Sequence, residues 1–528
     1  MKWAWCYLLV IFAAYFISTA TGTPPGDGDL WWQRWLGEAV LTTHRLPHAL
    51  GMETFTAAGA PWMPQEWLFG ICAFLGRAAI GGAIFKVAVA CCAVAAVALT
   101  AIRAARRGAT PAMTAAAATV TAIALFGSFG VRAQVVAWPL LAAFLLLLEL
   151  DGPAAWFAIP VAMLWANLHA SAMLAFVLAA VATVGCVCDE RGWTPRVRRS
   201  MLIACGVAVA LCCNPLGWEL PRYAVTLFGS PIRQYINEWR ITDVDDVWFV
   251  LGALPLLATA LTWGIGTAPR RWRDRFLFGV TAYLLLTAAR NIAIFALAVA
   301  PLVADSVSRS LTQRGRTAKP LETKRTLDIV LHAAMGLACV AVVVGVIHRP
   351  DGLQRPKSPL PLSAVAAMER IAGTHNVFCA NFAWCSLFLD HPDDRVFIDG
   401  RADPFPPAVW KDYADIVTLG ADWRTVLTKH RVDTLIVKRD SPLGQAMALL
   451  PNWLSAYADP TYRVYVLKPP PRNPSSRQRQ MASCNTCGQF EIPLAPASRT
   501  VRPRPKIAIL RKPMTVVVDR YRYNAPIW

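Results

Sequence analysis

Long runs of apolar residues recur between residues 3 and 347, and they limit the fold of this chain more than any other feature. A run of roughly 20 apolar residues crosses the hydrocarbon core of a bilayer as a helix, because only an internally hydrogen-bonded backbone is tolerated there. The composition agrees, since 56% of the 528 residues are hydrophobic and only 16% are charged. Such proportions fit no ordinary soluble protein, and we expect an α-helical polytopic membrane protein.

Dividing the apolar runs predicts about eleven spanning helices. They cover residues 3–20, 80–102, 113–130, 135–150, 154–165, 171–187, 201–213, 247–265, 276–289, 292–307 and 327–347. The first run has no small-x-small cleavage site before Pro24-Pro25, so we interpret it as a retained span rather than a signal peptide. The two short runs that flank Asn167-Leu168-His169 could instead form one bent element.

The net charge of +19 could suggest a nucleic-acid partner, but the positions of the basic residues argue against one. Alternate loops form two sets, and one set is much richer in Arg and Lys: Arg103, Arg106, Arg107, Arg191, Arg196, Arg198, Arg199, Arg270, Arg271, Arg273, Arg275, Arg309, Arg314, Arg316, Lys319, Lys324 and Arg325. The positive-inside rule makes this set cytoplasmic. We therefore expect a bacterial inner-membrane protein with a cytoplasmic N-terminus and a periplasmic C-terminal domain.

The membrane domain is predicted to cover residues 1–350, and it includes a long first periplasmic loop at residues 21–77. Loops of this length are usually functional or disordered. Apolar residues between Leu30 and Val40 recur at helical spacing, which predicts an amphipathic helix whose tryptophans suit the membrane interface. A second helix is expected to begin near Gln65.

The C-terminal part divides into a small periplasmic α/β domain at residues 351–468 and a basic, proline-rich tail at residues 469–528 that we expect to be mostly unstructured. Strand-like runs lie at 376–378, 395–398, 434–437 and 463–467. Cys379 and Cys385 lie in this domain, where an oxidising compartment would permit a disulfide. The isolated Cys484-x-x-Cys487 pair is weak evidence for zinc, and we predict no metal site.

Acidic residues lie just outside the first span, at the mouth of any cavity that the helices form. Asp27 and Asp29 precede the amphipathic helix, and a carboxylate at the edge of a partly dry site could act as a general base. Asp29 is equally well placed to cap that helix. Glu66 lies on the same side of the membrane, where its alternative role is an acid in the first turn of a helix.

Three cations lie within or beside the apolar runs: Lys86, Arg132 and Arg290. Cations at this depth are energetically costly and indicate a function, with a phosphate as their natural partner. The alternative is that the side chains extend to the interface, which suits Lys86 best and Arg290 least.

Weaker candidates for substrate binding are Asn167, His169, Asp399 and Arg401. His169 lies at the junction of two short spans, where a histidine more often caps a helix end than binds a ligand. Asp399 and Arg401 follow a strand and could form a ligand loop, although Asp-Gly is also an ordinary turn signal. The acidic group Asp243, Asp245 and Asp246 could bind a divalent cation, but a solvated turn is the simpler interpretation.

Several motifs taken together resemble the GT-C superfamily of membrane glycosyltransferases, and more closely a largely uncharacterised group of bacterial membrane proteins with a GT-C-like core. The motifs are Asp29-Leu30-Trp31-Trp32, Pro64-Gln65-Glu66-Trp67-Leu68, Asn167-Leu168-His169, Asn214-Pro215, Arg290-Asn291 and Phe397-Ile398-Asp399-Gly400-Arg401. The resemblance covers roughly residues 1–468.

The resemblance implies a transferase that moves a sugar from a polyprenyl-phosphate or pyrophosphate donor to a lipid, glycan or protein acceptor at the outer face. Asp29 would be the catalytic acid of the first outer loop, with Glu66 a second candidate, and Arg290, Arg132 and Lys86 would hold the donor phosphate. The cofactor is left open, a divalent cation included. The alternatives are a flippase for a lipid-linked or anionic solute, and a non-catalytic envelope assembly protein.

Overall fold

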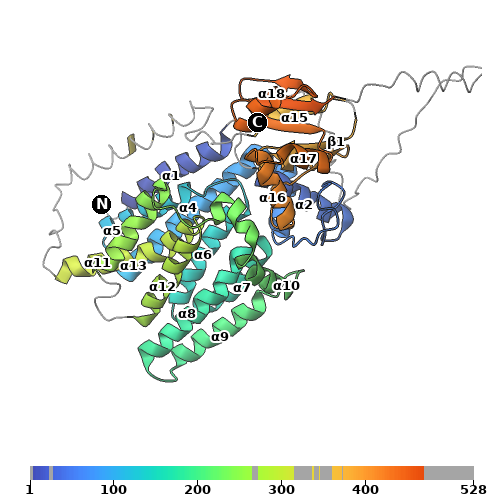
Figure 1. Cartoon of the computed structure of the whole chain (residues 1–528). Coiled ribbons are helices and arrows are strands. Elements are labelled where there is room, and N and C mark those ends of the chain that lie inside the picture. The colour runs from blue at the N-terminus through green and yellow to red at the C-terminus, as the bar shows by residue number, and fades with distance from the viewer. Residues whose placement is uncertain are drawn as a thin grey trace, which may run out of the picture.

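The computed structural model describes residues 4–22, 28–263, 271–313, 360–371 and 373–468, with isolated residues between 336 and 344. A helix bundle forms the larger part, and a small α/β domain lies over one end of it (Figure 1). The expected span at 327–347 lies almost entirely outside the described residues. Asp27, Cys484, Cys487 and the tail at 469–528 lie wholly outside them.

The bundle is built from helices that follow the apolar runs of the sequence. They are α1 (Ala4–Thr21), α3 (Trp67–Ile80), α4 (Gly82–Arg107), α5 (Pro111–Phe126), α6 (Ala133–Glu149), α7 (Ala158–Leu168), α8 (Met173–Glu190), α9 (Pro195–Ala210), α11 (Leu254–Trp263), α12 (Trp272–Thr287) and α13 (Asn291–Gln313). Each expected run up to residue 307 therefore coincides with a helix. The runs around His169 form two helices, α7 and α8, rather than one bent element.

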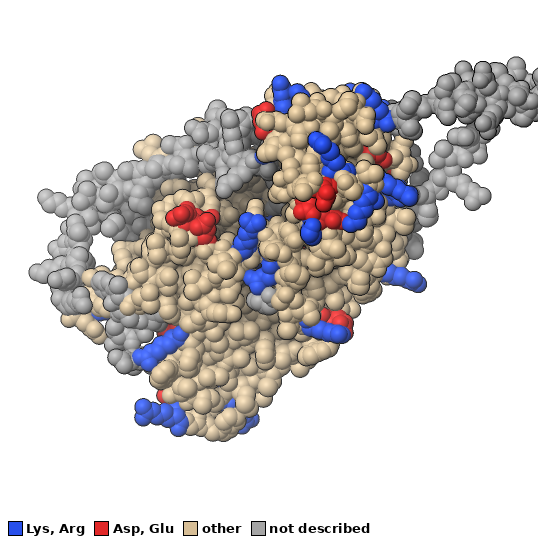
Figure 2. Space-filling view, in the orientation of Figure 1, with Lys and Arg blue, Asp and Glu red and all other residues tan. Residues whose placement is uncertain are grey.

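Three of the described segments are long and apolar enough to cross a membrane: Gly82–Arg107, Ala170–Glu190 and Asn291–Gln313. Several shorter helices are also apolar, and the surface of the bundle seen in Figure 2 carries few charged side chains, whereas many gather on the α/β domain. This distribution suits a bundle embedded in lipid. The figure of about eleven spans stays a prediction.

Small residues let the helices of the bundle approach closely. On α4, for example, Ala90, Ala93, Ala96, Ala101 and Ala104 are all fully buried. Burying alanine gains little in lipid through the hydrophobic effect, so close van der Waals packing must hold these helices together. Thr110 caps α5 through the backbone N–H of Met113, and Pro111 occupies its first position.

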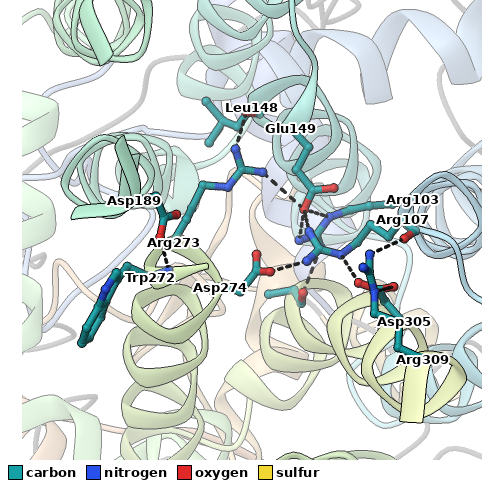
Figure 3. Close-up of polar contacts among 11 residues, drawn as sticks. Arg103, Arg107, Leu148, Glu149, Asp189, Trp272, Arg273, Asp274, Asp305 and Arg309 are labelled. Carbon is teal, nitrogen blue, oxygen red and sulfur yellow. Dashed lines mark hydrogen bonds and ion pairs between the residues drawn. The ribbon is translucent and has the colours of Figure 1, made fainter. Parts of the chain in front are cut away.

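An ion-pair cluster joins the helices at the end of the bundle that lies away from the α/β domain (Figure 3). Glu149, the last residue of α6, accepts hydrogen bonds of 2.7 Å from both Arg103 and Arg107 of α4, and Arg273 lies 3.7 Å away. Arg107 also pairs with Asp274 of α12, and Arg309 of α13 pairs with Asp305 at 2.7 Å. The arginines at this end belong to the set that the sequence predicts to face the cytoplasm.

Replacing Glu149 with Gln should destabilise the bundle strongly. The change leaves three buried or partly buried arginines without their shared carboxylate, and breaking a buried ion pair in this way typically costs about 3–5 kcal/mol. The thermal midpoint of the detergent-solubilised protein should fall clearly. Glu190→Gln is the matched control, because its pairing with Arg196 is largely exposed and such pairs contribute only about 0–1 kcal/mol. Equal midpoints for the two variants would contradict this role of the cluster.

The α/β domain contains a five-stranded sheet of order β2-β1-β3-β5-β4. The strands are β1 (His375–Cys379), β2 (Asp394–Val396), β3 (Thr434–Lys438), β4 (Trp453–Ala458) and β5 (Tyr462–Leu467), and the helices are α15 (Leu362–Met368), α16 (Pro407–Val417), α17 (Trp423–Lys429) and α18 (Pro442–Ala448). β2, β1 and β3 are parallel, while β5 is antiparallel to β3 and β4. The four expected strand runs match strands, and β4 is an addition.

The first outer loop and the α/β domain share one hydrophobic core. Helix α2 (Asp29–Thr43) is the expected amphipathic helix, but its Trp32 packs with Trp62 in the same cluster as Phe397 and Trp410 of the α/β domain. The backbone N–H of Val396 also donates to the carbonyl of Glu53 at 2.8 Å. The expectation that the loop tryptophans lie at the membrane interface is thus wrong for Trp32, which is buried by the domain above it.

Candidate functional site

A cavity of about 930 Å³ lies where the end of the bundle meets the first outer loop and the α/β domain. Most of the site residues expected from the sequence line it: Asp29, Glu66, Lys86, Arg132, His169, Arg290 and Arg401. They come from widely separated parts of the chain, and the fold brings them together. The cations stand at the ends of α4, α6 and α13 that lie opposite the Glu149 cluster.

Asp29 is the first residue of α2, but it does not cap the helix. The N-cap position is Gly28, and no side chain caps this end. The Asp29 carboxylate instead accepts a hydrogen bond of 3.3 Å from the Trp32 indole and pairs with Arg132 at 3.2 Å. The structure therefore turns this carboxylate toward the cavity, and the capping alternative does not hold.

Glu66 is buried beside the N-terminus of α3, and its carboxyl group also makes no capping bond. It accepts a hydrogen bond from the Gln33 side chain and lies 3.3 Å from Nε2 of His169. Burial raises the pKa of the Glu66 carboxyl to about 8, and the negative charge of Asp29 adds to the rise. Glu66 thus carries a proton at neutral pH and can exchange it near the operating range of an enzyme.

His169 connects Glu66 to a second set of hydrogen bonds. Its Nδ1 accepts from the backbone N–H of Ser171 at 3.1 Å, so the ring proton belongs on Nε2, which faces Glu66. The Trp165 indole donates to the Ser171 hydroxyl at 3.0 Å. Burial lowers the pKa of His169 to about 3, and Arg290 and Arg132 lower it further. His169 therefore has two roles. Its Nδ1 caps the turn after α7, and the neutral ring donates from Nε2 to the Glu66 carboxyl.

The three cations expected from the sequence line the same cavity. Arg132 bridges Asp29 and Glu238, with 2.7 Å to the latter, and Arg290 donates to Gln134 at 3.2 Å while its guanidinium lies over the Trp239 ring. Lys86 is buried in the cavity wall, so it does not extend to the surface as the alternative required. Burial lowers the pKa of Arg290, Glu238 opposes this effect, and Arg132 adds to the lowering by repulsion. An anion between the two arginines would relieve that repulsion.

Two weaker candidates have structural surroundings instead. Asp399 and Arg401 form a fully buried bidentate ion pair of 2.6 and 2.9 Å, and Arg401 also donates to Glu53 at 2.8 Å. The Arg401 guanidinium lies over the rings of Trp35 and Trp62. We infer that Asp399 and Arg401 fasten the α/β domain to the first outer loop.

Asn167 does not line the cavity, because its side-chain amide donates to the carbonyls of Met163 and Cys213. In the later outer loop, Asp246 accepts from the backbone N–H groups of Trp248 and Phe249, as a turn residue does. Within the described ranges, no group of three or more His, Cys, Asp and Glu residues is arranged to hold a metal ion.

Sequence reasoning missed several residues of the cavity, among them Asp403 and Tyr223. Asp403 enters it from the α/β domain and interacts with the hydroxyl of Tyr223, which lies on α10 (Glu219–Phe228). Burial raises the pKa of Asp403 to about 7 and raises that of Tyr223 as well. Ala402, just before Asp403, has a left-handed φ of 59°, a strained conformation that often accompanies function. Asp403 stood next to the Asp399-Gly400-Arg401 motif, but nothing in the sequence distinguished it from a turn residue.

Comparison with known proteins shows the fold. No protein-family model matches the chain, and no curated protein matches its sequence. The archaeal oligosaccharyltransferase AglB from Archaeoglobus fulgidus, solved with an inhibitory peptide and a dolichol-phosphate, is 11% identical with a TM-score of 0.52, over 82% of this chain and 69% of AglB. The arabinofuranosyltransferase AftD from Mycobacteria is 16% identical with a TM-score of 0.52, over 88% of this chain and 41% of AftD. This chain therefore shares its fold with these two glycosyltransferases, as the resemblance predicts.

The buried Glu66 should make stability depend on pH. Its carboxyl is protonated in the folded protein up to about pH 8 but is ionised above about pH 4.5 when unfolded, so the free energy of unfolding should fall as pH rises between these values. One such group contributes a slope of at most about 1.4 kcal/mol per pH unit. In Glu66→Gln this contribution disappears, and thermal midpoints from pH 5 to 8 should become less pH-dependent.

Glu38→Gln on the exposed face of α2 is the control, and it should keep the wild-type slope. If Glu66→Gln also keeps the wild-type slope, Glu66 does not take up a proton on folding.

Proposed function

We propose that this protein is a GT-C type glycosyltransferase that moves a sugar from a polyprenyl-phosphate or pyrophosphate donor to an acceptor at the periplasmic face of a bacterial inner membrane. The observation that carries the proposal is the single cavity in which the acids Asp29 and Glu66 face the cations Arg132, Arg290 and Lys86. Acids and cations that line one cavity suit a substrate that joins a phosphate to a group that must lose a proton.

The cations would hold the phosphate of the donor. Two guanidinium groups that repel each other across a partly dry cavity gain most from a shared anion, and charge-assisted hydrogen bonds to phosphate are strong. Apolar side chains of α8, α12 and α13 line the same cavity, among them Leu174, Val177, Val280, Leu284 and Ile294. They offer a path for a prenyl chain. The dolichol-phosphate bound to the structurally similar AglB is a lipid phosphate of this chemical class.

The acids would act on the acceptor. In the transfer step a bond forms between the acceptor oxygen and the anomeric carbon, the bond from that carbon to the phosphate oxygen breaks, and the phosphate leaves with the electron pair. The acceptor proton passes to a carboxylate. Asp29 is our first choice for this base, because it lines the cavity and pairs with Arg132, one of the proposed phosphate-binding cations. Glu66, held by His169 and Gln33, is the second choice and would orient the acceptor.

Replacing Asp29 with Asn should reduce transfer from a radiolabelled polyprenyl-phosphate sugar in membranes by roughly 10²–10⁴-fold, the usual contribution of a general base. The amide keeps the hydrogen bond to Trp32 but accepts no proton. Glu38→Gln, an acid of the same helix outside the cavity, should retain full transfer activity. Full activity of Asp29→Asn would remove Asp29 from the mechanism.

Replacing Arg290 with Ala should lower kcat by roughly 10²–10³-fold, because the leaving phosphate loses a preorganised cation. Arg290→Lys keeps the charge but not the planar, bidentate arrangement of donors, so it should recover part of the rate. The exposed Arg222→Ala on α10 serves as the matched arginine control. If Arg290→Ala raised KM and left kcat unchanged, Arg290 would bind the donor without stabilising the transition state.

A further inference from the structure

Two cysteines of the α/β domain lie unusually close together. Cys379 is the last residue of β1, and Cys385 lies in the short 3-10 helix Phe382–Phe388 that follows. Their Sγ atoms are 2.6 Å apart, which is closer than two unbonded sulfur atoms normally approach, whereas a disulfide bond is about 2.05 Å long. Both side chains are buried in the core of the domain.

We propose that Cys379 and Cys385 form a disulfide that fixes the segment between them, which is part of the cavity wall. The bond forms when the two thiols give up two protons and two electrons to a disulfide-bearing oxidant, which becomes a dithiol. The inference rests on the proposed location of the α/β domain in an oxidising compartment, and it is independent of the transfer reaction.

The segment between the two cysteines is part of the cavity wall. Asn381, Phe382, Ala383 and Trp384 all line it. A Cβ added at Gly28 would meet the Ala383 carbonyl oxygen at 2.5 Å, so this segment lies directly against the loop that carries Asp29. A disulfide at the two ends of this segment therefore fixes its position beside the proposed base, Asp29.

Other contacts hold the segment in the same position. The backbone N–H of Ala380 donates to the carbonyl of Ile436 on β3, and the Tyr413 hydroxyl donates to the carbonyl of Ala380, each at 2.9 Å. The Ser386 hydroxyl accepts from the backbone N–H of Gly400 at 2.9 Å. The folded domain thus holds the two cysteines in register before the bond forms.

The surroundings favour a permanent bond over a reversible switch. Burial raises the pKa of the Cys379 thiol, so Cys379 would hold little of the thiolate that exchange reactions need. The other described cysteines lie in or beside the helices of the bundle, where cysteine serves as a small apolar side chain.

The test uses the tryptic peptide of residues 371–395, which contains Cys379 and Cys385 and no other cysteine. Cells that express the full chain are quenched in acid, and the protein is denatured and treated with N-ethylmaleimide without reductant. We expect this peptide to be unlabelled and two hydrogen atoms lighter than the dithiol form. After reduction it should carry two labels. The peptide of residues 46–77, with Cys72 alone, is the internal control and should carry one label in both samples.

Two labels on the 371–395 peptide in the unreduced sample would overturn the proposal. Because this measurement does not depend on activity, it separates the two proposals: a protein that transfers sugar but carries free thiols loses only the disulfide. If the peptide is oxidised but the protein has no transfer activity, the disulfide proposal is supported and the proposed function is not.

Stability gives a second readout. The bond closes a short loop, so its removal in Cys379→Ala/Cys385→Ala should lower the midpoint of thermal unfolding by roughly 5 °C or more. Reductant present during the scan should lower the wild-type midpoint and leave that of the double variant unchanged, because the lost packing of the sulfur atoms does not respond to reductant. Equal responses of both proteins to reductant would count against the bond.

Discussion

Pairing of charges in a low-dielectric interior is the constraint on which both ends of this helix bundle depend. An unpaired ion there is costly, so the protein either pairs it or changes its protonation state. At the end formed by Arg103, Arg107 and Glu149, cations and carboxylates contact each other directly. At the cavity, Arg132 pairs with Asp29 and Glu238, whereas Glu66 and Asp403 have raised pKa values and Arg290 contacts the neutral amide of Gln134. The cavity therefore combines ion pairing with changes in protonation state.

The helix bundle could be predicted from the sequence because long apolar runs are a local feature with a direct physical consequence. Apolar runs of sufficient length have few alternatives to a helix, and the structure places a helix at each run that it describes. The strands of the α/β domain were readable where they were buried, as in β3. β4 was missed because it is an edge strand whose mostly apolar residues do not alternate with polar ones as those of a half-buried strand do. The buried position of Trp32 depends on Phe397 and Trp410, which no local pattern reveals.

The functional site could be predicted only in part, because some of its properties depend on contacts between residues far apart in the chain. Arg132 and Arg290 were candidates because a cation is costly at that depth of a membrane protein, and Asp29 was a candidate because it lies just outside the first span. Neither argument needs a tertiary contact. The neutral state of His169 and the proton on Glu66 follow from burial against residues far away in the chain, so the sequence left them open. Asp399 and Arg401 show the converse case. Their motif resembled a ligand loop, but the two side chains pair with each other and Arg401 also contacts Glu53.

The core shared by the first outer loop and the α/β domain also imposes an order on biogenesis. Trp32, Leu36 and Trp62 emerge early in synthesis, yet the residues that cover them, such as Phe397 and Trp410, follow several hundred positions later. At about 5–20 residues per second, the ribosome needs on the order of tens of seconds for that interval. During this time the tryptophans must be shielded by lipid or by a chaperone. The cavity therefore comes into existence only when the last soluble segment docks, and a prematurely terminated chain would insert into the membrane without a working pocket.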